Sequence, residues 1–219
     1  VLQETDLRED LLYMIEREVD RLLKTYIAPG MNPDEYIYDD LVSLVKEIHS
    51  EIPQLSYVEV KDIQGVKFEN VYAKLRDFAL EAYKQHEIKT VDFYNSVAEQ
   101  YRLDHVHEEP FSSNNVMRNL EKDLLLRVVD NRWIDHLHNI DMLREGIGLR
   151  AYGQKNPLLE YKKEAYEMFN NMMYDIQSET VKHLFRTKFG IQIVTPEQMA
   201  HPEDMVIPPQ TIVQDEDEN

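Results

Sequence analysis

The sequence predicts an all-α protein, with a helical domain, a long antiparallel two-helix hairpin and an irregular acidic C-terminal tail. Glycine is rare, with 6 residues among 219, and long stretches lack proline. In those stretches apolar residues recur at spacings of three and four, which is typical of one face of an α-helix. At 42% hydrophobic residues, the chain is apolar enough to bury a core.

Residues 1–113 are expected to form the first domain, from several helices. The first helix ends at Ala28-Pro29-Gly30, and its apolar face is formed by Leu11, Ile15, Val19, Leu22 and Tyr26. A second helix stops before Pro53, and its apolar face is formed by Leu41, Leu44, Val45 and Ile48. We expect residues 54–66 to be a loop, followed by a helix through Phe68, Val71, Leu75, Phe78 and Ala82.

The segment 91–113 leaves two interpretations open. Tyr94, Val97 and Tyr101 fit a continuation of the third helix, whereas the residues leading to Pro110 indicate a break.

Residues 114–190 are expected to form the hairpin. Two overlapping apolar stripes between Asn114 and Gly146 predict a helix buried on more than one side. It would run roughly 33 residues, or about 50 Å. A glycine-rich segment and Asn156-Pro157 then end this helix and start another, which Gly190 ends. Two consecutive helices of similar length joined by a short loop pack antiparallel.

Trp133 lies in a continuous apolar stripe and is predicted to anchor the packing of the hairpin, together with Leu137, Met168 and Phe169. A flexible peptide-binding groove around Met168, Phe169, Met172 and Met173 is the alternative. At helical spacing the core role is favoured, because methionine commonly fills irregular gaps in cores.

Residues 191–219 are expected to be a linker or tail. They contain four prolines and end in the acidic run Asp215-Glu216-Asp217-Glu218. Such a composition cannot build a core of its own.

The connection between the two hairpin helices is the candidate contact site. Between residues 146 and 163 a single glutamate opposes four basic residues, namely Arg150, Lys155, Lys162 and Lys163. Leu149 and Tyr152 add apolar and aromatic surface to this basic, glycine-rich tip. Such a tip suits contact with another molecule, but an ordinary turn whose tyrosine packs back on its own stem fits the residues equally well.

No motif for catalysis, a cofactor or a metal lies in the sequence context that its chemistry requires. Gly146-Ile147-Gly148-Leu149-Arg150-Ala151 matches G-x-G-x-x-A, but it follows a helix, whereas dinucleotide binding needs those glycines after a strand. The phosphate-binding pattern G-x-x-x-x-G-K-[ST] is missing from the sequence. Histidines and carboxylates near residues 105 and 136 lack the H-E-x-x-H spacing of a zinc site. We therefore predict no catalytic, cofactor-binding or metal-ligating residue, and most carboxylates are expected on solvated helix faces.

Charge and cysteine content exclude further classes. The net charge of −18 argues against nucleic acid as a partner, because phosphate binding needs a positive surface. With no cysteine, disulfides and thiolate catalysis are excluded.

The strongest family signal lies in residues 120–169. It is carried, in order and almost without gaps, by Leu125-Leu126-Arg127-Val128-Val129-Asp130, Trp133-Ile134-Asp135-His136-Leu137, Met142-Leu143-Arg144-Glu145-Gly146-Ile147, Leu149-Arg150-Ala151-Tyr152-Gly153-Gln154-Lys155-Asn156-Pro157, Glu160-Tyr161-Lys162 and Met168-Phe169. This segment closely resembles the two-helix finger of the SecA family. The earlier helices resemble the helical wing of that family more loosely.

The resemblance implies a non-catalytic piece of a cytoplasmic preprotein translocase ATPase that is peripherally associated with the inner face of the plasma membrane. The chain would comprise the helical wing domain (1–113), the two-helix finger of the helical scaffold (114–190) and a C-terminal tail (191–219). A start at Val1 instead of Met fits an excised fragment. ATP and Mg would be cofactors of the full-length protein, with none in this fragment.

The resemblance also implies partners: the SecY channel, the unfolded preprotein and the remaining SecA domains, with a homodimer possible for the full-length protein. The finger stem would restrain the motor ATPase. Contacts to preprotein and channel would come from the tip, at Tyr152, Leu149, Arg150, Gly153, Gln154 and Lys155. The competing class is a free-standing helical adaptor that binds peptides or partner proteins, and a phosphate-binding loop upstream in the complete gene would decide between the two.

Overall fold

The computed structural model describes residues 4–101, 113–148 and 156–186. Its five α-helices are α1 (Glu4–Tyr26), α2 (Tyr38–Glu51), α3 (Phe68–Tyr101), α4 (Ser113–Gly146) and α5 (Pro157–Arg186). Three short 3-10 helices lie between α1 and α3: η1 (Pro33–Glu35), η2 (Pro53–Leu55) and η3 (Val60–Asp62). The described residues contain no strand, and the predicted all-α class is confirmed.

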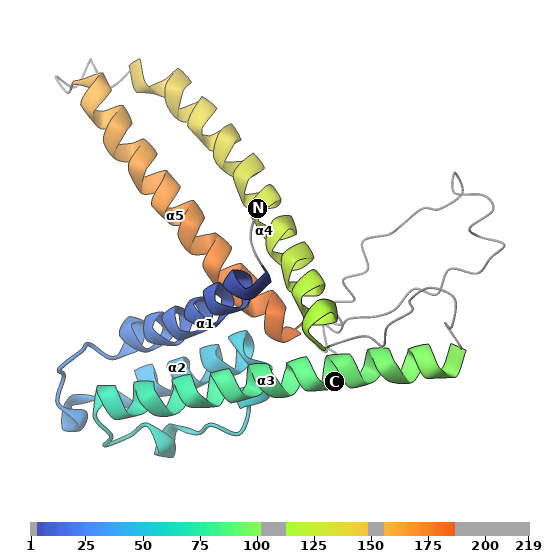
Figure 1. Cartoon of the computed structure of the whole chain (residues 1–219). Helices are drawn as coiled ribbons and strands as arrows, with labels where there is room; N and C mark the ends of the chain where they lie inside the picture. Colours follow the sequence, from blue (N-terminus) through green and yellow to red (C-terminus); the bar gives the residue numbers. More distant parts are fainter. Residues whose placement is uncertain (1–3, 102–112, 149–155, 187–219) are drawn as a thin grey trace, which may run out of the picture.

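The helices form two parts that meet at one end (Figure 1). Helices α1, α2 and α3 make a layer in which α1 contacts both α2 and α3. Helices α4 and α5 lie side by side, run antiparallel and rise away from that layer. The predicted hairpin is therefore confirmed. We call its lower part, residues 116–128 and 172–186, the base, and residues 133–146 and 157–169 the upper stem.

The main core joins the layer to the base of the hairpin. The predicted apolar face of α1 is buried from Leu11 to Leu22, and it packs with buried residues of α2 and α3. The last turns of α5 enter the same core through Val181, Leu184 and Phe185. The core thus crosses the boundary predicted between residues 113 and 114, and the division into domains stays a prediction.

The segment 54–66 is more ordered than the predicted loop. It contains η3, where the Asp62 carboxylate accepts a hydrogen bond from the Glu59 backbone N–H at 3.0 Å and closes a capping box. Leu55, Val58 and Ile63 are buried in the main core. The segment therefore forms part of the core, although it has neither helical nor strand periodicity.

Other boundaries follow the sequence signals closely. Helix α1 ends before Ala28-Pro29-Gly30, where Gly30 has φ of +81°, and α2 ends before Pro53. Helix α3 continues to Tyr101, which settles the first part of the ambiguous segment as helix. Residues 102–112 and the predicted tail at 191–219 lie outside the described residues. None of the described helices is long and apolar enough to cross a membrane.

Candidate functional site: the helical hairpin and its base

The predicted contact residues at the tip, Leu149, Arg150, Tyr152, Gly153, Gln154 and Lys155, lie outside the described residues. Their flanks are described. Helix α4 ends at Gly146, and α5 begins at Pro157 as predicted. The Asn156 side chain accepts a hydrogen bond from the Leu158 backbone N–H at 3.0 Å, which caps the start of α5. The tip is thus bounded by two defined helix ends.

The buried contact between α4 and α5 lies in the base of the hairpin. Val128 of α4 packs there against Met172 and Ile176 of α5, and all three side chains are buried. Leu124, Leu125 and Val129 are partly buried around them. Beside this cluster, Arg132 of α4 forms an ion pair with Glu179 of α5.

The prediction that Trp133, Leu137 and Phe169 anchor the hairpin as buried residues is wrong. Trp133 is 45% exposed, Leu137 48% and Phe169 42%, while Met168 is partly buried. The His136 ring lies between two of these aromatic side chains, 5.7 Å from the ring of Trp133 and 6.0 Å from that of Phe169 on α5.

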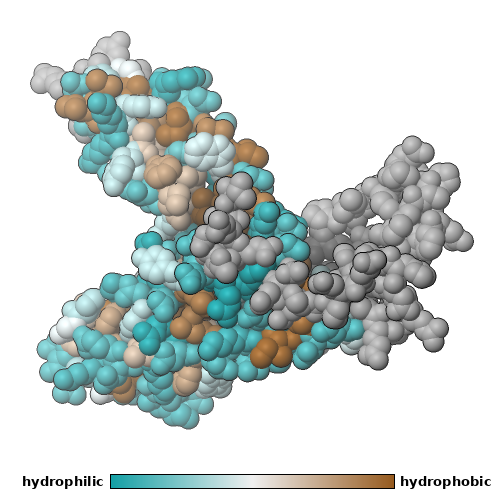
Figure 2. Space-filling model, in the orientation of Figure 1, coloured by the Kyte–Doolittle hydropathy of each residue, from teal (hydrophilic) through white to brown (hydrophobic). Residues whose placement is uncertain are grey.

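The physical reason is the width of the apolar surface of α4. Two overlapping stripes cover more than one side of the helix, and a single neighbouring helix can bury only one side. The upper stem therefore leaves large apolar side chains exposed, at Trp133, Ile134, Leu137, Met142, Leu158, Leu159, Tyr166 and Phe169. Figure 2 shows brown, apolar residues among teal and pale ones on the visible face of the hairpin.

Trp133→Ala should accordingly lower the free energy of unfolding by only about 1–2 kcal/mol, because half of the indole is already in water. Urea denaturation followed by circular dichroism measures the change. A loss of about 4 kcal/mol or more would mean that the indole is buried after all.

A polar cleft of about 300 Å³ separates the two helices in the middle of the hairpin. Its walls are formed by Arg132, Asp135, His136, His138, Asn139, Met168, Asn171, Met172 and Asp175. Within the described ranges, no three His, Asp or Glu side chains come together as metal ligands. The cleft mixes both charge signs with two methionines, and it does not define a chemical class of ligand.

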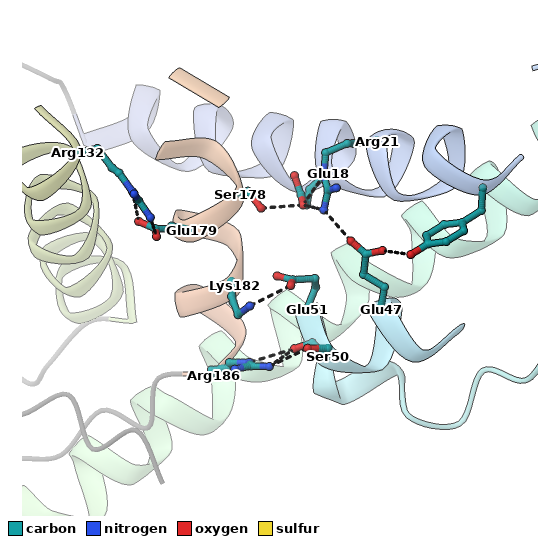
Figure 3. Close-up of polar contacts among 11 residues, drawn as sticks. Glu18, Arg21, Glu47, Ser50, Glu51, Arg132, Ser178, Glu179, Lys182 and Arg186 are labelled. Carbon is teal, nitrogen blue, oxygen red and sulfur yellow. Dashed lines mark hydrogen bonds and ion pairs between the residues drawn. The ribbon is translucent and has the colours of Figure 1, made fainter. Parts of the chain in front are cut away.

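Helix α5 is fixed to α1 by polar contacts at its base (Figure 3). The Ser178 hydroxyl donates a hydrogen bond of 3.0 Å to the Glu18 carboxylate, which is fully buried. Arg21 donates to the same Glu18 oxygen at 2.6 Å and reaches Glu47 of α2 at 3.5 Å. Ser178 of α5 is therefore linked to Glu18 of α1, and through Arg21 of α1 to Glu47 of α2.

Helix α5 is also fixed to α2 (Figure 3), and to η2. Lys182 forms an ion pair with Glu51 at 3.0 Å, and Arg186 donates to the backbone carbonyl of Ser50 at 3.0 Å. The Gln54 amide donates to the carbonyl of Phe185 at 2.7 Å. The contacts of Arg186 and Gln54 satisfy backbone carbonyl groups at helix ends, and all three contacts hold α5 against the layer.

Helix α4 meets α3 through a buried charged cluster that we call the α3–α4 cluster, formed by Tyr83, Glu87, Arg118 and Glu121. Arg118 pairs with Glu87 and with Glu121, each at 2.8 Å, and the Tyr83 hydroxyl donates a hydrogen bond to Glu121. Burial raises the pKa of Glu121 to about 7. Burial and the neighbouring carboxylate also raise the pKa of Tyr83, so its hydroxyl stays protonated and acts as a donor.

Sequence reasoning missed these charged residues because it placed carboxylates on solvated faces. A signal was available. Glu121 follows Met117 by four positions and precedes Leu124 by three, so it lies on an apolar stripe. Glu18 occupies the same kind of position between Ile15 and Leu22. A carboxylate at a stripe position predicts a buried, partnered charge.

Comparison with known proteins adds the family. A family model, the SecA Wing and Scaffold domain, matches residues 1–188. The chain is 36% identical over 198 residues to the protein translocase subunit SecA of Desulforudis audaxviator, covering 90% of this chain and 20% of that protein. It is 34% identical over 186 residues to SecA of Halothermothrix orenii, covering 85% of this chain and 19% of that protein. SecA of Thermus thermophilus is also 34% identical, over 194 residues. The chain spans about a fifth of the length of these relatives.

Proposed function

Because the chain belongs to the SecA family, we propose that it is the wing and finger part of a longer protein-translocation motor, in which it acts as a non-catalytic mechanical arm. One observation carries this proposal. The base of the hairpin is built into the main core through Val181, Leu184 and Phe185, whereas its upper stem leaves the layer with apolar side chains exposed. An arm needs this combination of a fixed base and a free end.

The dimensions of the hairpin support the role of an arm. Helix α5 has 30 residues, and a helix of that length measures about 45 Å. Polar contacts with α1, α2 and η2 hold its base, so a force on the tip is passed to the layer instead of bending a loop. In the longer protein, ATP and Mg belong to the domains outside this chain.

The exposed face of the upper stem supports a contact with the remaining SecA domains. Large contiguous apolar surfaces are rare on monomeric proteins and mark interaction sites. Trp133, Ile134, Leu137 and Phe169 lie on this stem, and aromatic and aliphatic anchors of this kind dominate interfaces. Through that contact the stem would restrain the motor ATPase.

The tip is proposed to contact the SecY channel and the unfolded preprotein, at the cytoplasmic side of the plasma membrane. The proposed residues are Leu149, Arg150, Tyr152, Gly153, Gln154 and Lys155. A phenol ring offers an apolar face and one hydrogen-bonding group, so Tyr152 can grip an extended peptide without requiring one sequence. The basic side chains would favour a negatively charged or carbonyl-lined channel mouth, in a contact that salt weakens.

Tyr152→Ala in the full-length protein should lower preprotein transport into vesicles about tenfold or more, while basal ATP hydrolysis stays near that of the wild type. The reason is that the substitution removes a contact at the tip and leaves the nucleotide-binding domains intact. Transport of one precursor and ATP hydrolysis are measured on the same preparation.

Tyr13→Ala is the matched control, because Tyr13 is an exposed tyrosine that belongs to α1 of the layer and not to the hairpin tip. It should leave transport unchanged. Equal transport by Tyr152→Ala and the wild type would reject the tip as a contact site. A full-length gene product without nucleotide-binding domains would instead favour the free-standing adaptor.

A further inference from the structure

The α3–α4 cluster has a feature that its structural role does not require. Glu121 is fully buried, yet only one of its two carboxylate oxygens has a partner. Oε1 accepts from the Tyr83 hydroxyl and from Arg118, while Oε2 is buried without a hydrogen-bond partner. An ionised carboxylate shares its charge over both oxygens, so a buried oxygen without a donor makes the ionised form costly.

The charges around Glu121 also favour a proton on it. Two carboxylates, those of Glu87 and Glu121, lie at 2.8 Å from the single guanidinium of Arg118. Arg8 of α1 pairs with Glu87 at 3.4 Å and lies over the Tyr83 ring at 5.9 Å, and its side chain is partly exposed, so it compensates the buried carboxylates less than Arg118 does. When two carboxylates share one cation in a buried site, one of them tends to keep its proton.

The groups that face Glu121 come from three helices: Arg8 from α1, Tyr83 and Glu87 from α3, and Arg118 from α4. Burial, opposed by the tyrosine hydrogen bond and by Arg118, leaves the pKa of Glu121 at about 7. Oε2 is the natural place for the proton, because Oε1 can still accept from Tyr83 and Arg118 as a carbonyl oxygen.

We propose that Glu121 is a proton-operated lock between α3 and α4: when it is protonated, the base of α4 is seated firmly on α3, and when it loses the proton, this contact loosens. The direction follows from burial. A neutral acid is tolerated in the closed contact, whereas the carboxylate gains free energy when the contact opens and water reaches Oε2. The same contact lies where the hairpin leaves the layer (Figure 1).

Linkage gives the pH window. In the open or unfolded chain the pKa of a glutamate is about 4.3. Between that value and about 7, the closed form holds a proton that the open form has released. The stabilisation of the closed form is therefore complete below about pH 4, falls as pH rises, and levels off above the folded pKa.

Hydrogen exchange of the backbone amides at residues 116–125 tests the lock in the whole 219-residue chain. After correction for the intrinsic exchange rate, their opening equilibrium should rise about tenfold per pH unit between about pH 5 and pH 7, then level off. Glu121→Gln should remove this dependence, because the amide does not titrate. Glu51→Gln is the matched control. It removes a carboxylate of α2 that is paired with Lys182 of α5, and the pH dependence of opening should persist in this variant.

Tyr83→Phe keeps the proposal testable if Glu121→Gln does not fold. It removes the hydroxyl that stabilises the ionised form of Glu121. The pH above which the opening equilibrium stops rising should therefore move upward by about half to one pH unit. If the Tyr83 hydroxyl had only a structural role, Tyr83→Phe would instead raise the opening equilibrium by the same factor at every pH. Infrared difference spectra of wild type against Glu121→Gln provide a direct reading. The carbonyl band of a protonated acid should be present at about pH 6 and lost at about pH 8.

Three outcomes would overturn the lock. The first is a carbonyl band that disappears near pH 4–5, as for an ordinary carboxyl group. The others are an opening equilibrium that is as pH-dependent in Glu121→Gln as in the wild type, and an opening equilibrium in Tyr83→Phe that stops rising at the same pH as in the wild type. None of these measurements uses transport. A failure of the lock therefore leaves the proposed mechanical role untouched, and the reverse also holds.

Discussion

Phe185→Ala should lower the free energy of unfolding by about 3–5 kcal/mol. Phe185 belongs to α5, but it is 3% exposed and lies in the main core with residues of α1, α2 and α3. Removing the ring leaves a cavity where the hairpin joins the layer, and cavities in packed cores are only partly filled by relaxation. Urea denaturation monitored by circular dichroism at constant pH measures the loss.

Phe169→Ala provides the matched control, because it removes the same side chain from the same helix. Phe169 is 42% exposed in the upper stem, so its loss should cost only about 1 kcal/mol. Similar losses for the two variants would show that the base of α5 is no more deeply packed than the upper stem. The anchored arm would then lose its physical basis.

Most of the fold could be predicted because most helices bury one apolar face, and the spacing of apolar residues along the sequence reveals that face. The stripe of α1 from Leu11 to Leu22 is buried as its spacing predicts, and proline or glycine stands just beyond the ends of α1 and α2. These signals are local and do not depend on a partner. The segment 54–66 was less predictable, because Leu55, Val58 and Ile63 are buried by neighbours that are distant in sequence.

The candidate site was harder to predict, because burial depends on what packs against a stripe. Trp133 and Val128 both lie on apolar stripes of α4, yet only Val128 faces α5 closely enough to be buried. Which stripe is covered depends on the rotation of α4 about its axis, and polar contacts in the base help to set that rotation. Tyr83 of α3 makes those contacts with Glu121 and Arg118 of α4, which follow it by 38 and 35 residues, beyond the reach of local periodicity.

Arg118→Met should lower the free energy of unfolding by about 3–5 kcal/mol at about pH 8. The substitution removes the cation that Glu87 and Glu121 share, so Glu121 is left as a buried carboxylate with only the Tyr83 hydroxyl as donor. The pKa of Glu121 is already raised by burial, and losing Arg118 raises it further. The folded variant therefore binds more protons than the unfolded chain, and its stability falls as pH rises through the folded pKa.

The loss caused by Arg118→Met should consequently shrink when the same denaturation is repeated at about pH 5, where a proton replaces the missing cation. Arg132→Met is the matched control on the same helix. Arg132 also pairs with a glutamate, Glu179, but both side chains are about one-third exposed. Water can solvate Glu179 after the substitution, so the loss should stay near 0–1 kcal/mol and change little with pH. A loss in Arg118→Met that is independent of pH would mean that the guanidinium acts mainly by filling space, and that the charge of Glu121 does not control how α4 is held on α3.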